Sequence, residues 1–241
     1  MLHDVDQALE AARTIGFPVI LKATAGGGGI GMTLCRSEHD VADGFAQVAR
    51  LGAGNFGDSG IFLERYIETA RHIEVQIFGD GQGHVVALGE RDCSLQRRNQ
   101  KVVEETPAPG LPAATRQAML DCAVRLTAAA HYLSAGTVEF LYDADRDSFF
   151  FLEVNTRLQV EHGVTEQVTG IDLVEWMVRA AAGDRAFLSD GVPAPSGAAI
   201  QVRLYAEDPT QGYRPSAGRL VEVTFPANVR VDGWIANGTD V

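Results

Sequence analysis

The sequence predicts an α+β fold with antiparallel sheets. Segments with apolar residues every three or four positions, typical of amphipathic helices, are separated from runs of β-branched and aromatic residues, which are typical of strands. Some of these runs follow each other closely enough to form hairpins, most clearly 137–142 and 149–155, which a turn-like segment at 143–147 joins. A chain of 241 residues with 46% hydrophobic content can bury a sizeable core and is too apolar to be disordered.

Charge and cysteine content exclude several classes of protein. A formal net charge of −12 disfavours non-specific binding to nucleic acids and to anionic membranes, because an acidic surface repels both. Cys35, Cys93 and Cys122 are far apart and form no Cys-x-x-Cys pair, so we expect neither zinc nor disulfides. The chain has no apolar run long enough to span a bilayer, and its first residues lack the features of a signal peptide. We therefore expect a cytoplasmic protein with reduced thiols.

The first part of the chain predicts a helix, a strand, a glycine-rich segment and a second strand. Asp4 is a suitable N-cap for a helix over 4–15, and Gly16 is a suitable stop. The strand over 17–23 contains Lys22 and leads into the glycines at 26–31. Their spacing matches G-x-G-x-x-G, but a strand follows instead of the helix that a dinucleotide site requires, and a Walker loop would have its lysine after the glycines. A phosphate-covering loop and a flexible hairpin tip both remain open.

The middle of the chain predicts further alternating elements. The strand over 72–77 places His72, Glu74 and Gln76 on one face, without a zinc-binding His-Glu-x-x-His pattern. The basic segment 91–101 is expected to be a loop that meets an anion, since it is conspicuous in an acidic chain. The other expected elements are helices over 37–51, 115–133 and 171–182, strands over 61–66, 84–90, 198–208 and 218–225, and linkers at 107–112 and 187–197. Within the 115–133 helix, one apolar stripe is expected to face the core: Ala118, Met119, Cys122, Leu126, Ala130 and Leu133.

Two carboxylates are predicted to lie side by side in the hairpin described first. Strand alternation places Glu153 and Asn155 on one face and directs Leu152 and Val154 into the core, while antiparallel pairing can set Glu139 beside Glu153. Two adjacent carboxylates repel each other unless a cation lies between them, and a hard divalent cation prefers oxygen ligands. Glu139, Glu153 and Asn155 therefore predict a magnesium site, with a solvent-exposed sheet face as the simpler alternative.

The residues after this hairpin continue the pattern. If the chain stays extended, Arg157, Gln159 and Glu161 lie on the same face and provide anion binders and a candidate base. The whole run Glu153-Val-Asn-Thr-Arg-Leu-Gln-Val-Glu-His162, continued by Val164-Thr-Glu166, closely resembles the signature of biotin carboxylases, which are ATP-grasp enzymes. The resemblance implies an ATP-grasp fold, in which two α+β subdomains grip ATP, followed by the start of a β-rich C-terminal domain. Its domains would be 1–188, with a glycine-rich lid at about 18–66, and 198–241.

The resemblance also implies roles for individual residues. The nucleotide would contact Lys22, Gly27, Gly28, Gly29, Glu64, Tyr66, Ile67, His72, Gln96 and Asn99. Many relatives have Lys at the position of Arg65 and His at the position of Asn99. Glu139, Glu153 and Asn155 would bind Mg²⁺ or Mn²⁺, and Arg157, Gln159, Val160 and Glu161 would bind bicarbonate. Glu161 would be the base, Lys101 would join the bicarbonate pocket, and Arg203 would stabilise the enolate of biotin.

This resemblance implies an enzyme that carboxylates biotin with ATP and bicarbonate through carboxyphosphate. Its partners would be a separate biotin carrier domain and a carboxyltransferase domain outside this chain, without nucleic acid or membrane, and a homodimer is compatible with the family. The family is longer at both ends, so we expect the isolated chain to be weakly active or inactive. Gly163, Val174-Glu-Trp-Met177 and Val231-Asp-Gly-Trp-Ile235 resemble the carboxylase portion of urea carboxylases (urea amidolyases).

Three alternatives to this interpretation remain. The chain could be part of an acyl-CoA or pyruvate carboxylase. It could also belong to another ATP-grasp ligase of the carbamoyl-phosphate synthetase type, which shares the glycine loop and the metal-binding pair but needs no biotin. The third alternative is a non-catalytic remnant that binds a nucleotide without turnover.

Overall fold

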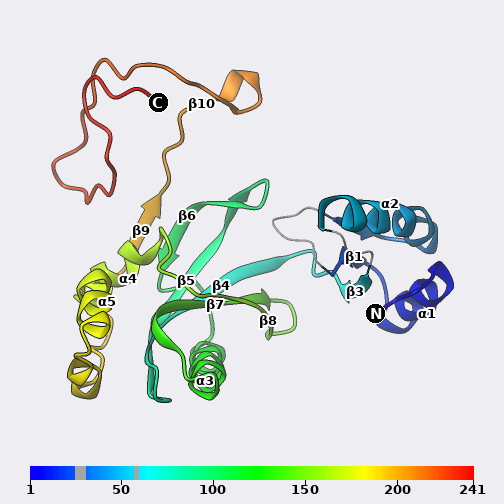
Figure 1. The fold of residues 1–241 in the computed structure, drawn as a ribbon, viewed down its shortest axis with the longest axis horizontal. Helices are drawn as coiled ribbons and strands as arrows, with labels where there is room; N and C mark the ends of the chain where they lie inside the picture. Colours follow the sequence, from blue (N-terminus) through cyan, green and yellow to red (C-terminus); the bar gives the residue numbers. More distant parts are fainter. Residues whose placement is uncertain (25–30, 57–59) are drawn as a thin grey trace. The chain divides into compact units, whose positions relative to one another are not determined.

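The computed structural model describes residues 1–24, 31–56 and 60–241 (Figure 1). The predicted glycine loop, including Gly27, Gly28 and Gly29, lies outside the described residues. The chain divides into two units, residues 1–201 and residues 202–241, which are described separately below. In the described part of the chain, no helix is both long and apolar enough to cross a membrane.

The N-terminal part of the first unit is a small three-stranded antiparallel sheet with two helices. Its elements are α1 (Val5–Ile15), β1 (Val19–Ala23), β2 (Met32–Cys35), α2 (Glu38–Phe56) and β3 (Ile61–Arg65), and the strand order is β2-β1-β3. Asp4 caps α1 as predicted, because its carboxylate accepts a hydrogen bond from the backbone N–H of Gln7 at 2.8 Å. The apolar faces of both helices and of β1 form one core, with Ala8, Ala12, Leu21, Val41 and Val48 fully buried.

A six-stranded sheet forms the centre of the first unit. Its strands are β4 (Ala70–Asp80), β5 (Val85–Arg97), β6 (Gln100–Thr106), β7 (Leu133–Asp143), β8 (Ser148–Asn155) and β9 (Ala199–Val202), in the order β8-β7-β4-β5-β6-β9. Helix α3 (Ala113–Ala129) packs on one face of this sheet (Figure 1). Ile73, Val75 and Ile77 of β4 pack there with Met119 and Ala123 of α3. The strand alternation that directs these odd-numbered residues to α3 directs His72, Glu74 and Gln76 to the opposite face.

The opposite face of the central sheet is partly covered by α4 (His162–Thr169) and α5 (Leu173–Ala181). Phe78 and Leu173 are buried in this second core, and the Phe78 ring meets the Trp176 ring edge-on with centroids 5.4 Å apart. The predicted Pro- and Gly-rich linker begins inside this core, because Phe187 and Leu188 are buried in the 3-10 helix Ala186–Asp190.

Several sequence-based expectations about the elements are wrong. Helix α2 continues to Phe56 and does not end before Gly52. The basic segment 91–101 is a hairpin of β5 and β6 and not a loop. Its turn consists of Arg98 and Asn99, which have φ angles of 51° and 64°, and asparagine adopts this left-handed conformation more readily than most residues.

The buried face of α3 also differs from the predicted stripe. It consists of Thr115, Met119, Ala123 and Thr127, which are spaced by four residues. Leu126 is exposed, and Leu133 belongs to β7. Thr127 is buried at low cost because its hydroxyl donates to the carbonyl of Ala123 at 2.7 Å.

The second unit contains little regular structure. It has two short paired strands, β10 (Glu207–Asp208) and β11 (Arg214–Pro215), joined through the 3-10 turn Pro209–Gln211. The long strand predicted over 198–208 is therefore interrupted after Val202, and the strand predicted over 218–225 is absent apart from one bridge between Arg219 and Asp240. The boundary between units falls after Gln201, inside the predicted 198–208 strand.

Candidate active site

The hairpin of β7 and β8 places Glu139 directly opposite Glu153, which is the predicted register. A β-bulge lies between this pair and the next, since Phe140 pairs with Phe151 and leaves Leu152 without a partner residue. The bulge changes which residues share a face. Phe151 contacts the Phe140 ring, whereas Glu153 faces the same side as Glu139. The prediction that Leu152 enters the core is wrong, because the bulge leaves it 37% exposed.

Glu139 is the buried centre of a polar cluster. Its Oε1 atom accepts hydrogen bonds from Lys101 at 2.7 Å, from Asn155 at 3.0 Å and from Gln159 at 3.1 Å. Its Oε2 atom lies 3.0 Å from Nε2 of His72. Burial opposes the ionisation of this carboxyl, but the hydrogen bond and charge of His72 and the charge of Lys101 prevail and lower its pKa to about 2. Glu139 is therefore a carboxylate at neutral pH.

Lys101 connects three carboxylates from three parts of the chain. Its Nζ atom lies 2.5 Å from Glu74 on β4, 2.7 Å from Glu139 on β7 and 2.8 Å from Glu161 at the start of α4. Burial of the ammonium opposes its charge, but the surrounding carboxylates raise the pKa of Lys101 above its usual value. The carboxylates and the ammonium thus hold each other in the charged state, as buried charges must.

Glu161 reaches this cluster by a different path from the one predicted. After Asn155 the chain leaves the strand and turns into α4, for which Glu161 is the N-cap residue. The expected extended ladder of Arg157, Gln159 and Glu161 is therefore wrong. Gln159 and Glu161 are buried in the cluster, whereas Arg157 is exposed and donates to the Leu158 carbonyl at 3.3 Å.

Two cluster residues were missed as site residues from the sequence. Glu74 is fully buried and binds Lys101, although its alternation with His72 already placed it on this face. Arg91 is also fully buried, and its Nε atom donates to Oε1 of Glu74 at 2.6 Å. Burial of the Glu74 carboxyl opposes its charge, but Arg91 and Lys101 keep its pKa below the usual value. No local motif around Arg91 distinguishes its buried guanidinium from the less buried ones of Arg97 and Arg98.

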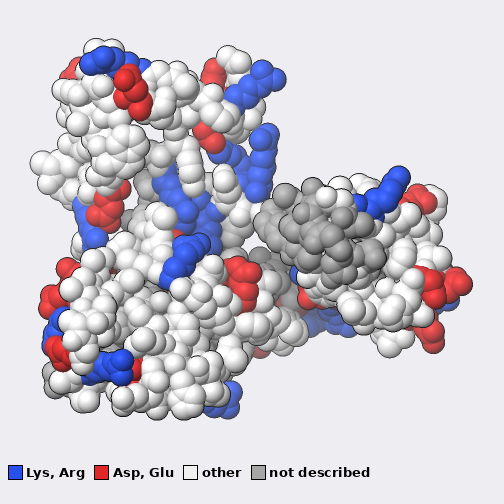
Figure 2. All heavy atoms as spheres, viewed as in Figure 1, with Lys and Arg blue, Asp and Glu red and all other residues white. Residues whose placement is uncertain are grey.

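The basic hairpin contributes Lys101 and Gln96, which are paired across β5 and β6. Gln96 donates its side-chain amide to the carbonyl of Cys93 at 2.9 Å, while Asn99 lies in the exposed turn. Figure 2 shows Lys and Arg side chains gathered over this hairpin, although the chain as a whole is acidic. A locally positive surface therefore adjoins the carboxylate cluster.

The N-terminal sheet carries the predicted nucleotide residues of the lid. Lys22 of β1 forms an ion pair with Glu64 of β3, so these two predicted nucleotide contacts hold each other in this structure. The backbone N–H of Tyr66 donates to the Pro18 carbonyl at 3.0 Å, which fixes the start of the segment that leads to β4.

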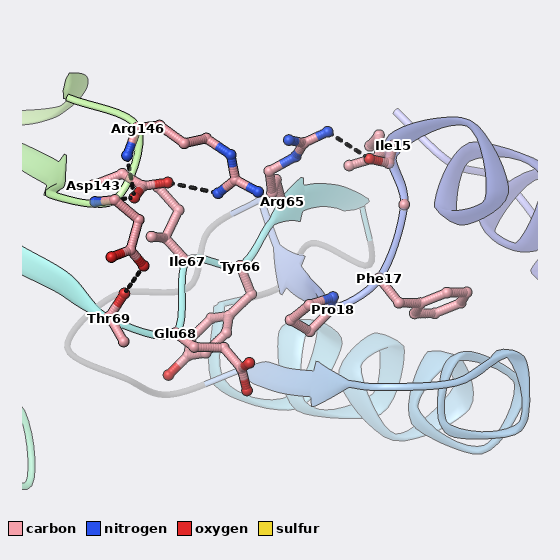
Figure 3. Close-up of a pocket in the computed structure, with 12 residues that line it drawn as sticks. Ile15, Phe17, Pro18, Arg65, Tyr66, Ile67, Glu68, Thr69, Asp143 and Arg146 are labelled. Carbon is pink, nitrogen blue, oxygen red and sulfur yellow. Dashed lines mark hydrogen bonds and ion pairs between the residues drawn. The ribbon is translucent and has the colours of Figure 1, made fainter. Parts of the chain in front are cut away.

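Tyr66 and Ile67 also line a cavity of about 350 Å³ at this segment (Figure 3). Arg65 and Arg146 lie on one side of the segment in this view, and Tyr66 and Glu68 lie on the other. Arg65 donates to the Ile15 carbonyl at 2.7 Å, so its guanidinium ties the segment to the end of α1. Residues 65–67 are therefore anchored to Pro18 and to the end of α1.

Val160 and Arg203 complete the predicted set. The Val160 side chain is exposed, and its carbonyl accepts from the Gln201 side chain at 3.2 Å. Arg203 belongs to the second unit, whereas the cluster belongs to the first. The structure therefore brings together His72, Lys101, Glu139, Glu153, Asn155, Gln159 and Glu161.

The donor set fits a hard divalent cation. Glu139, Glu153 and Asn155 supply two carboxylates and one amide oxygen from adjacent strands, which are the ligand types that Mg²⁺ prefers. Glu153 is exposed, so this set opens to solvent. Two other groups of described residues place their ligand atoms within 4.8 Å of one another, His72 with Glu74 and Glu139, and Glu74 with Cys93 and Glu161. Lys101 contacts carboxylates in both of these groups as well as Glu139 of the predicted set.

Comparison with known proteins identifies the family. Residues 1–187 match the model of the carbamoyl-phosphate synthase L chain, ATP binding domain. The chain belongs to this family. The chain is 54% identical over 241 residues to urea amidolyase of Saccharomyces cerevisiae, covering 100% of the chain and 13% of that protein. It is 49% identical over 238 residues to the propionyl-CoA carboxylase alpha chain of Ruegeria pomeroyi, covering 99% of the chain and 35% of that protein.

A solved structure confirms the predicted ATP-grasp fold. The biotin carboxylase domain dimer of Hydrogenobacter thermophilus 2-oxoglutarate carboxylase, in complex with MgADP, ADP and bicarbonate, matches with a TM-score of 0.89 and 41% identity. The match covers 100% of this chain and 53% of the chain of that structure. The chain thus spans about half of this structure and a small part of the urea amidolyase, so the predicted biotin carboxylase resemblance holds over the whole of the shorter sequence.

Proposed function

We propose that this chain is the ATP-binding part of an enzyme that carboxylates biotin with ATP and bicarbonate, within a urea carboxylase. The observation that carries the proposal is the contact of Lys101 with both Glu139 and Glu161. It connects the candidate metal ligands to the candidate base through one ammonium group. The 54% identity to a urea amidolyase and the likeness to a biotin carboxylase domain with MgADP and bicarbonate support it.

The cluster residues can activate bicarbonate for attack on ATP. Glu161 accepts the proton of bicarbonate, whose oxygen forms a bond to the γ-phosphorus while the bond to the β–γ bridging oxygen breaks. The products of this step are ADP and carboxyphosphate. A magnesium ion on Glu139, Glu153 and Asn155 would neutralise charge on the phosphates when it is bound. Lys101 stabilises the negative charge on the transferred group, as a fixed cation in a water-poor site does most effectively.

Other residues bind and orient the reactants. Arg157, Gln159 and the backbone of Val160 would hold bicarbonate, since Gln159 already faces the cluster and Arg157 remains exposed. Lys22, Glu64, Tyr66, Ile67, His72, Gln96 and Asn99 would hold the nucleotide. Carboxyphosphate then releases phosphate and carbon dioxide. The released phosphate accepts the proton of biotin N1′, and N1′ forms a bond to the carbon of the carbon dioxide. Arg203 would stabilise the biotin enolate in this last step.

The partners follow from this reaction. Biotin would be presented by a separate carrier domain, and a carboxyltransferase domain would pass the carboxyl group on to urea. We infer a cytoplasmic location and place Mg²⁺ or Mn²⁺ at the site. We also propose that the isolated chain is weakly active or inactive, with a homodimer as the assembly to be tested. The propionyl-CoA carboxylase relative at 49% identity makes an acyl-CoA acceptor the second candidate.

Calorimetric titration with MgADP tests nucleotide binding directly. Wild type should bind, and Glu153→Gln, which removes one exposed candidate ligand, should bind about tenfold more weakly without loss of stability. Equal affinities of the two proteins would contradict the assignment of the metal ligands. Phosphate release from MgATP should also rise when bicarbonate and free biotin are added to an extended chain. If bicarbonate alone gives the full rate, a carbamoyl-phosphate synthetase type of ligase is favoured instead.

A further inference from the structure

Arg91 is a buried cation that the reaction described above does not use. Its side chain has no exposed surface, and it is among the largest fully buried side chains of the described residues. It donates to Glu74 at 2.6 Å and to Gln76 at 2.8 Å, both on β4, and to Thr137 of β7 at 3.3 Å. It also donates to Thr165 of α4 at 2.8 Å. One guanidinium on β5 therefore links three other elements.

Such an arrangement is poorly explained by stability alone. Removing a guanidinium and a carboxylate from water costs several kcal/mol per ion in general, and apolar residues of similar volume often serve a core as well or better. Glu74, the partner of Arg91, is fully buried too. Because the burial of this ion pair costs free energy, we explain it by the groups that its hydrogen bonds hold in place.

Two paths of contacts connect Arg91 with the pair formed by Lys101 and Glu161, and each path reaches one member of the pair. In the first, Arg91 binds Oε1 of Glu74, and Oε2 of Glu74 binds Lys101 at 2.5 Å. In the second, Arg91 binds Thr165, which lies one helical turn after Glu161 in α4. Both paths converge on the contact between Lys101 and Glu161, which are 2.8 Å apart.

We propose that Arg91 is a positioning residue of the anion pocket, where it fixes Glu74 and the first turn of α4 so that Lys101 and Glu161 meet. This inference rests on the proposed function, because the Lys101 and Glu161 pair is the assigned site of bicarbonate activation. In this arrangement Arg91 acts on Lys101 through its hydrogen bond to Glu74, and on Glu161 through its hydrogen bond to Thr165.

The chain offers a control with the same ion-pair geometry, in which the carboxylate is buried and the guanidinium is partly exposed. Arg116 donates its Nε atom to Oε1 of Glu90 at 2.6 Å, which is the same atom pair and distance as in Arg91 and Glu74. Glu90 precedes Arg91 on β5 and therefore faces the other side of the sheet, towards α3. Arg116→Met should lower stability without altering the anion pocket, whereas Arg91→Met should alter both.

The first measurement observes Lys101 directly. The sequence contains two lysines, Lys22 and Lys101, so ¹⁵N-lysine labelling gives two side-chain ammonium signals, and Lys22→Arg assigns them. In wild type the Lys101 ammonium should exchange its protons slowly with water. Exchange should be about tenfold faster in Arg91→Met. It should be about threefold faster in Thr165→Val, which removes the hydrogen bond between Arg91 and Thr165 and leaves the ion pair of Arg91 and Glu74 intact. Arg116→Met should leave it unchanged.

Each outcome of this measurement decides the proposal. Faster exchange in both Thr165→Val and Arg91→Met, with Arg116→Met unaffected, supports it, and partial recovery in Arg91→Lys would show that the charge matters. If Arg91→Met does not fold, Thr165→Val and Arg91→Lys decide. Unchanged exchange in the folded variants would overturn the proposal, as would equally faster exchange in Arg116→Met, because Arg91 would then be only a structural residue.

The second measurement separates this proposal from the proposed function. Binding of [¹³C]bicarbonate, followed by its line width, should weaken about tenfold in Arg91→Met, while the Kd of MgADP changes by less than about twofold. Parallel weakening of both ligands would show general loss of structure and overturn the positioning role. If wild type binds no bicarbonate, the proposed function fails, and the exchange of the Lys101 ammonium still decides whether Arg91 positions that group.

Discussion

Replacing Glu139 by Gln should make the stability of the protein less dependent on pH. The pKa of Glu139 in the folded chain is about 2, against an ordinary value of 4.5, because His72 and Lys101 favour the carboxylate. A difference of this size corresponds to about 3 kcal/mol of stability. Glu139→Gln should therefore cost about 3 kcal/mol at pH 7, where the wild-type carboxylate is fully ionised in both states.

The sign of the pH effect follows from proton binding. Since the folded pKa lies below the unfolded one, the unfolded chain takes up a proton first as the pH falls. The contribution of Glu139 is thus complete above about pH 5 and is lost between about pH 4.5 and pH 2. Urea unfolding of wild type and Glu139→Gln at pH 7, 5 and 4 measures it, and the difference between the two proteins should begin to shrink below pH 5. Glu153→Gln is the control, because exposed Glu153 should contribute less than about 0.5 kcal/mol.

A difference between wild type and Glu139→Gln that stays constant from pH 7 to pH 4 would refute this reasoning. It would mean that Glu139 stabilises the fold through packing or neutral hydrogen bonds. A smaller difference at pH 7 than at pH 4 would contradict the direction of the pKa shift itself.

Three further predictions concern the core and the backbone. Met119→Ala should destabilise the protein by about 2–5 kcal/mol in urea unfolding, because Met119 is fully buried between α3 and the central sheet. Gly79→Ala should destabilise by more than about 3 kcal/mol or prevent folding, because a Cβ atom there would lie 2.1 Å from the Tyr132 carbonyl oxygen. Gly54→Ala in α2 should instead stabilise the protein by up to about 1 kcal/mol and raise its melting temperature slightly, because the Cβ position there has open space around it.

Local signals in the sequence were sufficient for the elements that depend on neighbouring residues. Asp4 and Gly16 mark the two ends of α1. Asp4 caps the first turn with its side chain and Gly16 adopts a φ angle of 83°, and both are properties of single residues that the sequence shows directly. The pairing of Glu139 with Glu153 was predictable because a short turn fixes the register of a hairpin. The ATP-grasp fold required more than this, namely the long signature that begins at Glu153.

The rest of the site depends on contacts between distant parts of the chain. Lys101 meets Glu74 and Glu161 only after three elements assemble, and no local pattern encodes that meeting. Arg91 lies in a segment with two other arginines, Arg97 and Arg98, and spacing could not show that Arg91 is the one that is fully buried. The extended path predicted for Arg157 to Glu161 was wrong because helix α4 begins at His162 and draws the preceding residues into a turn.

The second unit shows the same limit in another way. Its residues alternate as strands do, yet only Glu207–Asp208 and Arg214–Pro215 form paired strands there. Alternation states which residues could share a face of a sheet, but a strand also needs a neighbour that takes up its backbone hydrogen bonds. In the described part of this unit, such neighbours are short.

The unpaired residue at Leu152 sets the phase of everything that follows it in β8. With Phe140 opposite Phe151 and no bulge, Leu152 would lie opposite Glu139, and strict alternation would turn the carboxylate of Glu153 and the amide of Asn155 towards the side where Phe151 meets Phe140. The extra residue therefore moves this polar pair onto the face of Glu139. Deleting Leu152 should leave Glu139 opposite Glu153 in a regular ladder, whereas inserting one more residue beside it should exchange the wet and dry sides of the strand.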